Sequence, residues 1–527
     1  MPDQIFLPQF VSRNAVTSPD AIALQHVDGR SMTWQELDAT SQSWATALER
    51  QGVRFGEPVV TIFPMGFEAA QSWIGAAALG AIEAPINSSY KGTWLKHPID
   101  LTGARHMLID ARFLDAVAEI ADTISGVELL VVFGADGRDL PSLPFRVITG
   151  EEFLHGAEPT ERESRKRWEI ASLIFTSGTT GPSKAVMVPY GHLESLMNAD
   201  IGYERGAETQ YAPFPPYHIT GKGPIYSSAE YCGRVVMREV FSTKAYWQDV
   251  REHGCTGAVI LGPMAQFLLS QPEKDDDAQN PLEHVLMAPV IPEIDRFCER
   301  FGVAVHTVFN MTEINSPVTS SSRSVDGETY RSCGRPRPGV EVRIVDEHDI
   351  EVPPDTPGEM MVRAEPWALN AGYWGMPEKT AEAWRNGWFH TGDTFTRDED
   401  GNLYFVDRAK DYIRRRGENI SSFEVETTVN GHPDVLEAAA VAVPSPEGED
   451  EVKVAVVMIE GKLLDPESII EYLIPRMPRF AIPRYIEEIA ELPKTQATQR
   501  IQKAEIRATG IGEHTWDRIA AGVELPR

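Results

Sequence analysis

The sequence predicts an α/β fold, with a large N-terminal domain of layered α/β sheets plus a small β-rich subdomain, followed by a small mobile α+β C-terminal domain. Three observations lead to this prediction. Helix-like segments alternate with short β-branched runs from about Ala15 to Ile350. A turn-rich pattern then replaces the alternation, which begins again after Asp407. The chain has 527 residues, more than one hydrophobic core supports, so several folded units are expected.

The first helices and strands follow from the spacing of apolar residues. Trp34–Gln51 and Gly66–Leu79 carry helical patterns, which predicts two helices. Short runs of β-branched and apolar residues are typical of strands. The strands predicted in this way are Pro58–Phe63, Met107–Ile109, Val127–Phe133 and Leu173–Thr176. Alternation of the two kinds of element predicts sheets covered by helices.

The later part of the chain is predicted to form two smaller units. Val340–Val362 joins two strand-like runs through the turn-rich HDIEVPPDTPG, which predicts a hairpin in a β-rich subdomain at about 335–408. The pattern that follows predicts strands at Ala438–Val443 and Val452–Ile459 and a helix at Pro466–Arg476. The expected domains are therefore 1–408 and 409–527. Their junction is short and charged rather than rich in Gly and Ser, which favours a hinge near Lys410.

The overall charge argues against some classes of partner. With 49 basic and 78 acidic residues the net charge is −29, which is unfavourable for a nucleic-acid or anionic-membrane surface. One basic run departs from this balance, and both a solvated face and an anion-binding role stay open for it. It consists of Arg408, Lys410, Arg414, Arg415 and Arg416.

The cysteines and the first residues indicate the compartment. The four widely spaced cysteines form neither a disulfide framework nor a zinc-ligand pattern. The start, MPDQIFLPQF, lacks the features of a signal peptide, and no apolar stretch approaches the ~20 residues of a membrane-spanning helix. A cytoplasmic protein without stable membrane insertion is expected.

A loop after the strand Leu173–Thr176 is predicted to hold phosphate groups. Gly178 and Gly181 let backbone N–H groups approach phosphate oxygens, and Lys184 adds a positive charge. Hydroxyl side chains also occupy this loop, at Thr176, Ser177, Thr179, Thr180 and Ser183. The spacing does not match the P-loop pattern GxxxxGKS or GxxxxGKT, so a plain solvent loop stays open from this segment alone.

The segment TSGTTGPSK at 176–184 resembles the phosphate loop of the adenylate-forming superfamily, which includes acyl-CoA and aryl-CoA synthetases, non-ribosomal adenylation domains and firefly luciferase. Further segments resemble that family's motifs and occur in its order. They are Met32–Leu37, Ala78–Ile86, Phe309–Glu313, Gly358–Glu359 with Gly372–Trp374, Thr391–Asp393, Asp407–Asp411 and Gly417–Ile420. The series spans nearly the whole chain, and the resemblance implies ATP, Mg²⁺ and coenzyme A as ligands.

The resemblance implies a metal and adenylate motif at Phe309–Glu313. Attack of a carboxylate on the α-phosphate of ATP requires neutralised phosphate charge and Mg²⁺ held by oxygen ligands. Glu313 is the expected metal ligand, and Thr312 would contact the α-phosphate. Asn310 and Met311 belong to the same nucleotide motif. A helix cap at Thr312 and Glu313 stays open as a structural interpretation.

The resemblance also implies residues for the ribose and for the acyl group. Asp393 would accept hydrogen bonds from the ribose hydroxyls and Arg408 would donate to the same sugar, although a turn residue at Asp393 stays open. Pro215–Lys222 resembles the family's aromatic and histidine gate beside the acyl pocket. His218 would orient the substrate carboxylate or yield to the incoming thiol. Lys222 either faces an anionic substrate group or is solvated.

The basic run gains a role from the resemblance, because family members adenylate in one orientation of the small domain and transfer the acyl group to coenzyme A in another. Lys410 matches the hinge position, and Gly417 matches the glycine near the pantetheine tunnel. Arg414–Arg416 would meet the phosphates of coenzyme A.

The C-terminal end departs from the family pattern Pro-x-Thr-x-x-Gly-Lys, whose lysine bridges substrate carboxylate and phosphate. Counting from Pro493 by strict spacing, Gln499 stands at the lysine position; with one inserted residue, Arg500 does. Arg500 is the expected catalytic residue because the following register then fits, and arginine keeps the charge in a planar, bulkier form. Neither Lys494 nor Lys503 has the spacing of a replacement.

The acyl pocket is expected to combine polar and apolar groups. Asn310, where glycine is commoner, and Asn315 add amides near the wall, and Thr220 and Lys222 lie in the gate segment. Apolar wall is expected from Phe214, Tyr217, Met264 and Phe309.

The function implied by the resemblance is that of an acyl-CoA ligase for a small carboxylic acid. Ile86–Gly92 and Phe309–Ile314 are similar to the branch of medium/long-chain fatty acid and crotonobetaine/carnitine-CoA ligases. Two alternatives stay open: a stand-alone adenylation enzyme loading a carrier protein, and a weakened nucleotide- or acyl-adenylate-binding protein without the usual lysine. A homodimer is also left open by the resemblance.

Overall fold

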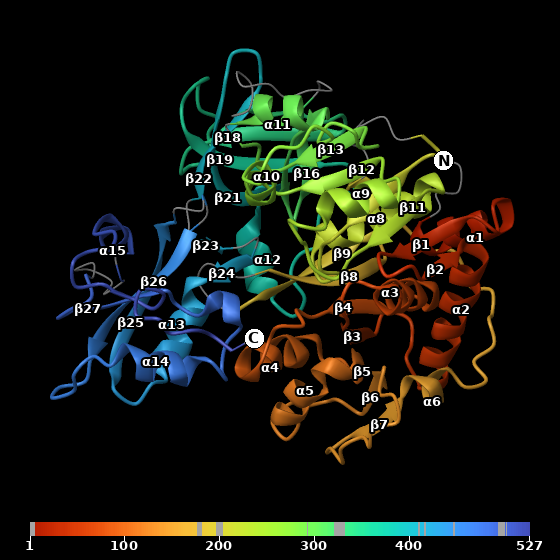
Figure 1. Ribbon diagram of the computed structural model, residues 1–527, viewed down its shortest axis with the longest axis horizontal. Helices are drawn as coiled ribbons and strands as arrows, with labels where there is room; N and C mark the ends of the chain where they lie inside the picture. The colour runs from red at the N-terminus through yellow and green to blue at the C-terminus, as the bar shows by residue number, and fades with distance from the viewer. Residues whose placement is uncertain are drawn as a thin grey trace.

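The computed structural model describes residues 6–176, 182–196, 204–291, 293–320, 332–408, 412–415, 418–445, 448, 450–493, 501 and 503–526. Figure 1 shows a larger body formed by the N-terminal and central elements, with a smaller body beside it formed by the elements that follow β22 (Leu403–Arg408). The boundaries expected at 335 and 408 stay predictions.

The first sheet of the larger body arises from the predicted alternation of strands and helices. Its strand order is β7–β6–β5–β3–β4–β8–β9, with β8 and β9 antiparallel and the other neighbours parallel. The strands are β3 (Pro58–Ile62), β4 (Ile82–Pro85), β5 (His106–Asp110), β6 (Leu129–Phe133), β7 (Arg146–Thr149), β8 (Ile170–Thr176) and β9 (Lys184–Pro189). The strands predicted in this region are confirmed.

The two helices predicted near the N-terminus are also confirmed. α2 (Trp34–Arg50) begins at a capping box between Thr33 and Glu36, and α3 (Phe67–Leu79) ends at Gly80 in the left-handed conformation. The helices approach closely at Gly75, where an added Cβ would lie 2.6 Å from the Cβ of Trp44.

A second sheet has the strand order β14–β13–β12–β10–β11–β1–β2. Its strands are β1 (Ile22–His26), β2 (Ser31–Thr33), β10 (Thr209–Ala212), β11 (Arg234–Met237), β12 (Gly257–Ile260), β13 (His284–Met287) and β14 (Val305–His306). One buried cluster joins it to the first sheet, with Trp73 of α3, Ile174 of β8 and Tyr226 of α8 (Ile219–Tyr231) among its members. The other helices here are α1 (Leu7–Thr17), α4 (Gly92–Thr102), α5 (Leu114–Ile120), α6 (Gly150–Leu154), α7 (Tyr190–Leu196), α9 (Tyr246–Glu252), α10 (Gly262–Leu269) and α11 (Ile294–Phe301).

A third, antiparallel sheet closes the larger body. Its order is β15–β16–β17–β22–β21–β19–β18, with β20 (Trp384–Arg385) beside β21. The remaining strands are β15 (Val308–Met311), β16 (Asn315–Thr319), β17 (Ser332–Pro336), β18 (Val340–Val345), β19 (Gly358–Ala364) and β21 (Trp388–Arg397), and one helix, α12 (Pro377–Ala383), precedes β20. The predicted hairpin is confirmed, because β18 and β19 pair antiparallel from Val340 opposite Ala364 to Val345 opposite Glu359.

The smaller body has its own sheet, with the order β25–β26–β27–β28. Its strands are β25 (Val435–Pro444), β26 (Asp450–Met458), β27 (Tyr485–Glu488) and β28 (Trp516–Asp517), with a separate hairpin of β23 (Tyr412–Arg415) and β24 (Glu418–Ser421). The helices are α13 (Ser422–Asn430), α14 (Pro466–Leu473) and α15 (Lys503–Ala508). The two predicted strands and the predicted helix of this region are confirmed.

One side chain of the larger body belongs to the core of the smaller one. Trp94 of α4 is 6% exposed and packs in the cluster that contains Val429 of α13 and Ile469 of α14. Its indole Nε1–H donates to Thr428 Oγ1 at 3.3 Å. The two bodies therefore share apolar surface.

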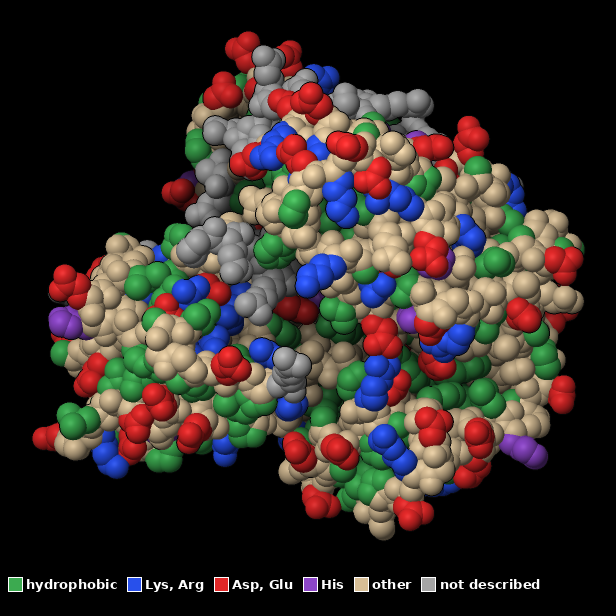
Figure 2. All heavy atoms as spheres, viewed as in Figure 1, with side chains coloured by type: hydrophobic (Ala, Val, Ile, Leu, Met, Phe, Trp, Pro, Cys, Tyr) green, Lys and Arg blue, Asp and Glu red, His purple; other side chains and the backbone are tan. Residues whose placement is uncertain are grey.

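The surface agrees with the mixed charge of the sequence. On the face shown in Figure 2, acidic and basic side chains are interspersed rather than gathered into one broad basic field. Among the described residues, no helix has both the length and the apolar character needed to cross a bilayer.

Candidate functional site

The predicted phosphate loop connects the two antiparallel strands at one end of the first sheet. Thr176 ends β8 and pairs in register with Lys184, which begins the antiparallel neighbour β9. The Oγ1 of Thr176 is buried and has no hydrogen-bond partner in the described part of the chain. The predicted loop residues Ser177, Gly178, Thr179, Thr180 and Gly181 lie outside the described residues.

The predicted metal ligand lies in the turn of another hairpin. Thr312 and Glu313 connect β15 to β16, which pair with Met311 opposite Asn315. The helix-cap interpretation is therefore wrong, because this segment turns between strands. Glu313 is buried, its carboxylate Oε1 accepts the hydroxyl proton of Tyr373 at 3.1 Å, and its carbonyl accepts from the backbone N–H and Nδ2 of Asn370 at 3.0 and 2.7 Å.

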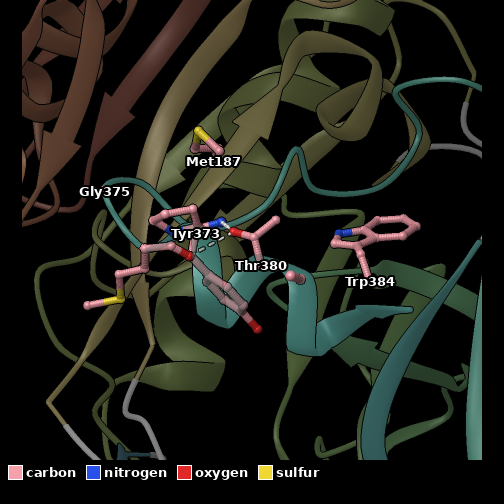
Figure 3. A pocket seen from close by; sticks show the side chains of 8 residues that line it. Met187, Tyr373, Gly375, Thr380 and Trp384 are labelled. Atoms are coloured by element: carbon pink, nitrogen blue, oxygen red, sulfur yellow. Dashed lines mark hydrogen bonds between the residues drawn. The ribbon is translucent and has the colours of Figure 1, made fainter. Parts of the chain in front are cut away.

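Tyr373 also lies beside the lysine of the phosphate loop. The Lys184 Nζ is 4.1 Å from the centroid of the tyrosine ring, a distance at which a cation interacts with an aromatic face. Figure 3 shows Tyr373 at the wall of a pocket of about 460 Å³. This pocket is lined by Met187, Tyr373, Gly375, Met376, Pro377, Thr380, Ala381 and Trp384.

The predicted gate meets the smaller body. His218 is the N-cap residue of α8, and its Nε2 lies 3.3 Å from the Oε2 of Glu418 in β24. The neighbouring Tyr217 lies with its hydroxyl 3.5 Å from the other oxygen of Glu418. Burial raises the pKa of Tyr217, so the ring carries a neutral phenol that donates to this carboxylate. Glu418 belongs to the predicted motif Gly417–Ile420, but no feature of the sequence indicated its contact with His218.

The two predicted ribose residues lie opposite each other on adjacent strands. Asp393 in β21 pairs in register with Arg408 in β22. The turn interpretation of Asp393 is wrong, because the residue lies within a strand and is 3% exposed. Asn310 is half-buried and donates from Nδ2 to the Oγ of Ser316 at 3.0 Å, and Met311 is half-buried beside it.

The position of Lys222 shows that both interpretations of this residue, a contact with an anionic substrate group and a solvated side chain, are wrong. It is 1% exposed, and its Nζ forms an ion pair with the carboxylate of Glu83 in β4 and lies 4.1 Å from the ring centroid of Trp73. Ser172 donates to the same carboxylate at 2.9 Å. Lys222 is therefore neither solvated nor part of the acyl site, because α8 packs this face against α3 and the first sheet.

The basic run contains another buried ion pair. Arg415 is 3% exposed, lies with Nε 2.8 Å from the Oε2 of Glu451, and donates to the carbonyls of Phe480 and Ile482. Arg415 thus belongs to the interior of the smaller body, and both a solvated face and a contact with coenzyme A phosphates are wrong for it. Arg414 is half-buried, and its backbone N–H donates to Asp450.

Other predicted residues are placed away from the site or lie outside the described residues. Asn315 is fully buried and donates to the carbonyl of His192, so it is not available at the pocket wall. Lys503 binds the Oε1 of Glu426 at 2.6 Å and the Oγ of Ser422, both in α13. Outside the described residues lie Lys410, Arg416, Gly417, Lys494, Gln499 and Arg500.

A carboxylate of the smaller body reaches the end of the phosphate loop, which the sequence did not indicate. The backbone N–H of Ser183 donates to the Oε1 of Glu424 in α13 at 3.2 Å. His97 binds the carbonyl of the same serine at 2.8 Å. Burial raises the pKa of Glu424 to about 7, while the bond from Ser183 acts in the opposite direction.

The residues present fit a magnesium–nucleotide complex. Among the described residues there is no cluster of three or more His, Cys, Asp or Glu side chains that would hold a metal by itself. Mg²⁺ commonly takes one or two carboxylates and completes its shell with phosphate oxygens and water. The single carboxylate of Glu313 and the unpartnered hydroxyl of Thr176 suit such a shared site.

Comparisons with known proteins find similarity over nearly the whole chain. Residues 11–374 match the family described as AMP-binding enzyme, and residues 424–498 match the AMP-binding enzyme C-terminal domain. A sulfoacetate–CoA ligase of Cupriavidus necator is 30% identical over 498 residues, covering 93% of this chain and 95% of the relative. A crotonobetaine/carnitine–CoA ligase of Proteus mirabilis is 26% identical, covering 90% and 93%, and a feruloyl-CoA synthase of an Amycolatopsis species is 29% identical, covering 94% and 97%.

Solved structures share the fold. An amide bond synthetase from Marinactinospora thermotolerans has a TM-score of 0.83 at 25% identity, covering 96% of this chain and 99% of that one. A double mutant of an o-succinylbenzoate CoA synthetase from Bacillus subtilis, bound with a product analogue, has a TM-score of 0.83 at 23% identity. The o-succinylbenzoate CoA synthetase from Bacillus subtilis in complex with AMP has a TM-score of 0.68, and in both cases 95% of this chain and 98% of that one are covered.

Proposed function

The chain belongs to the family of AMP-binding enzymes, and on that premise we propose that it is an acyl-CoA ligase whose nucleotide site lies between the phosphate loop and the Thr312–Glu313 turn. In the first step a carboxylate oxygen attacks the α-phosphorus of ATP, and the bond to pyrophosphate breaks. In the second step the thiol sulfur of coenzyme A attacks the acyl carbon, and AMP leaves with the electrons of the mixed-anhydride bond.

The arrangement around Tyr373 carries the proposal. This one side chain contacts both the carboxylate of Glu313 and the ammonium of Lys184, which come from different hairpins. The cation lies over the face of the ring and the carboxylate lies at its hydroxyl, and the phosphate groups of a bound nucleotide would contact both. Lys184 would bind phosphate oxygens, and Glu313 would hold Mg²⁺, which neutralises phosphate charge when bound.

The remaining predicted residues take the roles that their positions support. Asp393 and Arg408 would bind the ribose from adjacent strands. His218 would act at the acyl carbon, and its pairing with Glu418 would hold the imidazole while the thiol approaches. Lys410 as hinge, Gly417 at the pantetheine tunnel and Arg500 as the phosphate-stabilising cation stay proposals from the sequence.

The relation of the two bodies supports the second step. The TM-score is higher for the double mutant of the Bacillus subtilis enzyme with a product analogue than for the enzyme with AMP, at equal coverage. We infer that the arrangement seen here is the one for acyl transfer, with Glu418 brought to the gate.

A panel of acids tests the proposal. The purified chain is given ATP, Mg²⁺ and sulfoacetate, crotonobetaine, carnitine, ferulate or fatty acids of increasing length, and ATP–pyrophosphate exchange is measured. Exchange that depends on one class of acid is expected, followed by its coenzyme A thioester, detected by mass, when coenzyme A is added. A Glu313→Gln protein is the control and should lose the exchange.

Three other outcomes would contradict an acyl-CoA ligase. Exchange without a thioester, but with acylation of a pantetheinylated carrier, would indicate a carrier-loading enzyme. Exchange followed by amide formation with a free amine would indicate the chemistry named for the Marinactinospora enzyme. Nucleotide binding without exchange for any acid would indicate a protein that has lost turnover.

A further inference from the structure

We propose that Tyr373 is a positioning residue, which orients the carboxylate of Glu313 and seats the ammonium of Lys184 for a metal-bound triphosphate. The proposal rests on the proposed function, in which these two side chains bind Mg²⁺ and phosphate. It assigns a separate task to each end of one tyrosine: the hydroxyl aims the carboxylate, and the ring holds the ammonium.

The two contacts are of different kinds. The hydroxyl of Tyr373 donates to the Oε1 of Glu313 at 3.1 Å, and the Lys184 Nζ lies 4.1 Å from the ring centroid. A phenol bound to one carboxylate oxygen restricts the rotation of the group and leaves the second oxygen to face another ligand. An ammonium on an aromatic face is attracted by the negative face of the ring, which fixes its place beside the tyrosine.

The side chain that makes both contacts is buried. Tyr373 is 4% exposed, so the residues packed around it restrict the movement of its ring. Pre-positioned charges of this kind lower the cost of organising the site when the ligand binds.

The backbone of Tyr373 is fixed on both sides. It forms an antiparallel bridge with Val186 of β9, and the flanking bonds run from Met187 N–H to Gly372 O at 2.9 Å and from Trp374 N–H to Ala185 O at 2.8 Å. The N–H of Tyr373 donates to the Oγ1 of Thr380 at 2.9 Å (Figure 3).

Gly372 allows this close packing. Its φ is +101°, a conformation that favours glycine, and an added Cβ would meet the Cγ2 of Thr380 at 2.5 Å. The ring position is therefore set by β9, the strand that begins with Lys184 itself.

Two substitutions separate the contacts. Tyr373→Phe removes the hydroxyl bond to Glu313 but keeps the ring beneath Lys184. Tyr373→Leu removes both. Tyr246→Phe is the matched control, because Tyr246 is fully buried and its hydroxyl has no hydrogen-bond partner in the described part of the chain.

Equilibrium binding of ATP to the full chain, by calorimetry, tests the proposal without relying on turnover. It is measured with EDTA and again with saturating Mg²⁺, and the unfolding midpoint of each variant is recorded. Tyr373→Phe should bind ATP in EDTA within about twofold of the native chain but lose about tenfold of the Mg²⁺-dependent gain. Tyr373→Leu should also weaken binding in EDTA by about threefold to tenfold. Tyr246→Phe should leave both values unchanged.

The outcomes separate this inference from the function on which it rests. If the native chain binds ATP with a gain from Mg²⁺ and Tyr373→Phe does the same, the positioning role is wrong and the proposed function stands. If Tyr373→Phe lowers the unfolding midpoint and weakens ATP binding equally with and without Mg²⁺, the tyrosine is merely structural. If the native chain does not bind ATP, the proposed function fails and the inference fails with it.

Discussion

At the scale of single residues, the described structure buries several charged side chains in ion pairs inside the fold. Lys222 with Glu83 and Arg415 with Glu451 are at most 5% exposed as side chains. A buried charge is tolerated when a partner and further hydrogen bonds replace its water, as the hydroxyl of Ser172 does for Glu83. Such residues stabilise the framework of the site without contacting substrate.

Breaking the Lys222–Glu83 pair should destabilise the larger body. Lys222→Met leaves the Glu83 carboxylate buried without its cation, which should lower the free energy of unfolding by about 3–5 kcal/mol. Adding Glu83→Gln should recover most of the loss, because the remaining buried group is then neutral. Denaturant unfolding measures both changes.

A surface pair provides the control for this prediction. Lys379 and Glu382 lie 2.8 Å apart with about half of each side chain exposed, so Lys379→Met should change the free energy of unfolding by less than about 1 kcal/mol. Equal losses of unfolding free energy in Lys222→Met and Lys379→Met would show that the buried pair stabilises the fold no more than the surface pair does.

At the scale of helices and strands, local sequence patterns predict the elements well, but contacts between residues far apart in the sequence cannot be predicted from them. The β18–β19 hairpin follows from a turn-rich segment between two strand-like runs, all within one short stretch of sequence. The capping box at Thr33 and Glu36 is equally local. By contrast, Lys222 and Glu83 are 139 positions apart, and nothing near either residue indicates the other.

The candidate site shows the same division. The order of the motifs assigned Asp393 and Arg408 to the same ligand, and the two residues are paired in the register of β21 and β22. The partner of Glu313 could not be predicted, because the contact with Tyr373 depends on how residues 371–374 lie along β9. The environment of Arg415 could not be predicted from residue type either. A basic run suggests a solvated or anion-binding surface, whereas the fold places the carboxylate of Glu451 in β26 beside this arginine.

The first turn of α13 should make the contact between the two bodies depend on pH. Burial raises the pKa of Glu424 from its ordinary value of 4.5 to about 7 when it accepts from Ser183, with the buried Tyr90 nearby. A raised pKa means that the docked arrangement favours the protonated acid. The stabilisation of the docked arrangement by protonated Glu424 is therefore complete below pH 4.5, declines between pH 4.5 and 7, and is lost above about pH 7.

Hydrogen exchange checks this dependence. Protection of α13 and of the peptide containing Ser183, corrected for intrinsic rates, should decrease between pH 5 and 8 in the native chain. Glu424→Gln should keep protection nearly constant over that range, because an amide does not titrate. A pH dependence that survives in Glu424→Gln would assign the effect to another group.

At the scale of the whole molecule, polar contacts and the indole of Trp94 join the two bodies in the part of the chain that the structure describes. His218 meets Glu418, and Ser183 meets Glu424, so both contacts link the smaller body to segments of the proposed active site. In these two contacts of the described residues the smaller body contributes acidic side chains, Glu418 and Glu424.

Removing the charge of Glu418 should affect the two steps unequally. Glu418→Gln weakens the hold on His218, so transfer from a preformed acyl-adenylate to coenzyme A should slow by about tenfold. ATP–pyrophosphate exchange should stay within about twofold, because the proposal assigns the contact to acyl transfer. Rapid-quench measurements of each step test the difference, and an equal loss in both would contradict it.

The fluorescence of Trp94 should report whether the two bodies are docked or separated. The chain has 11 tryptophans, but Trp94 is the indole of the larger body that lies in the core of the smaller one and bonds to Thr428. If the bodies separate, this indole passes from an apolar, hydrogen-bonded environment into water, and its emission moves to longer wavelength. The difference spectrum between the native chain and Trp94→Phe would isolate that signal and follow domain rearrangement during turnover without any attached dye.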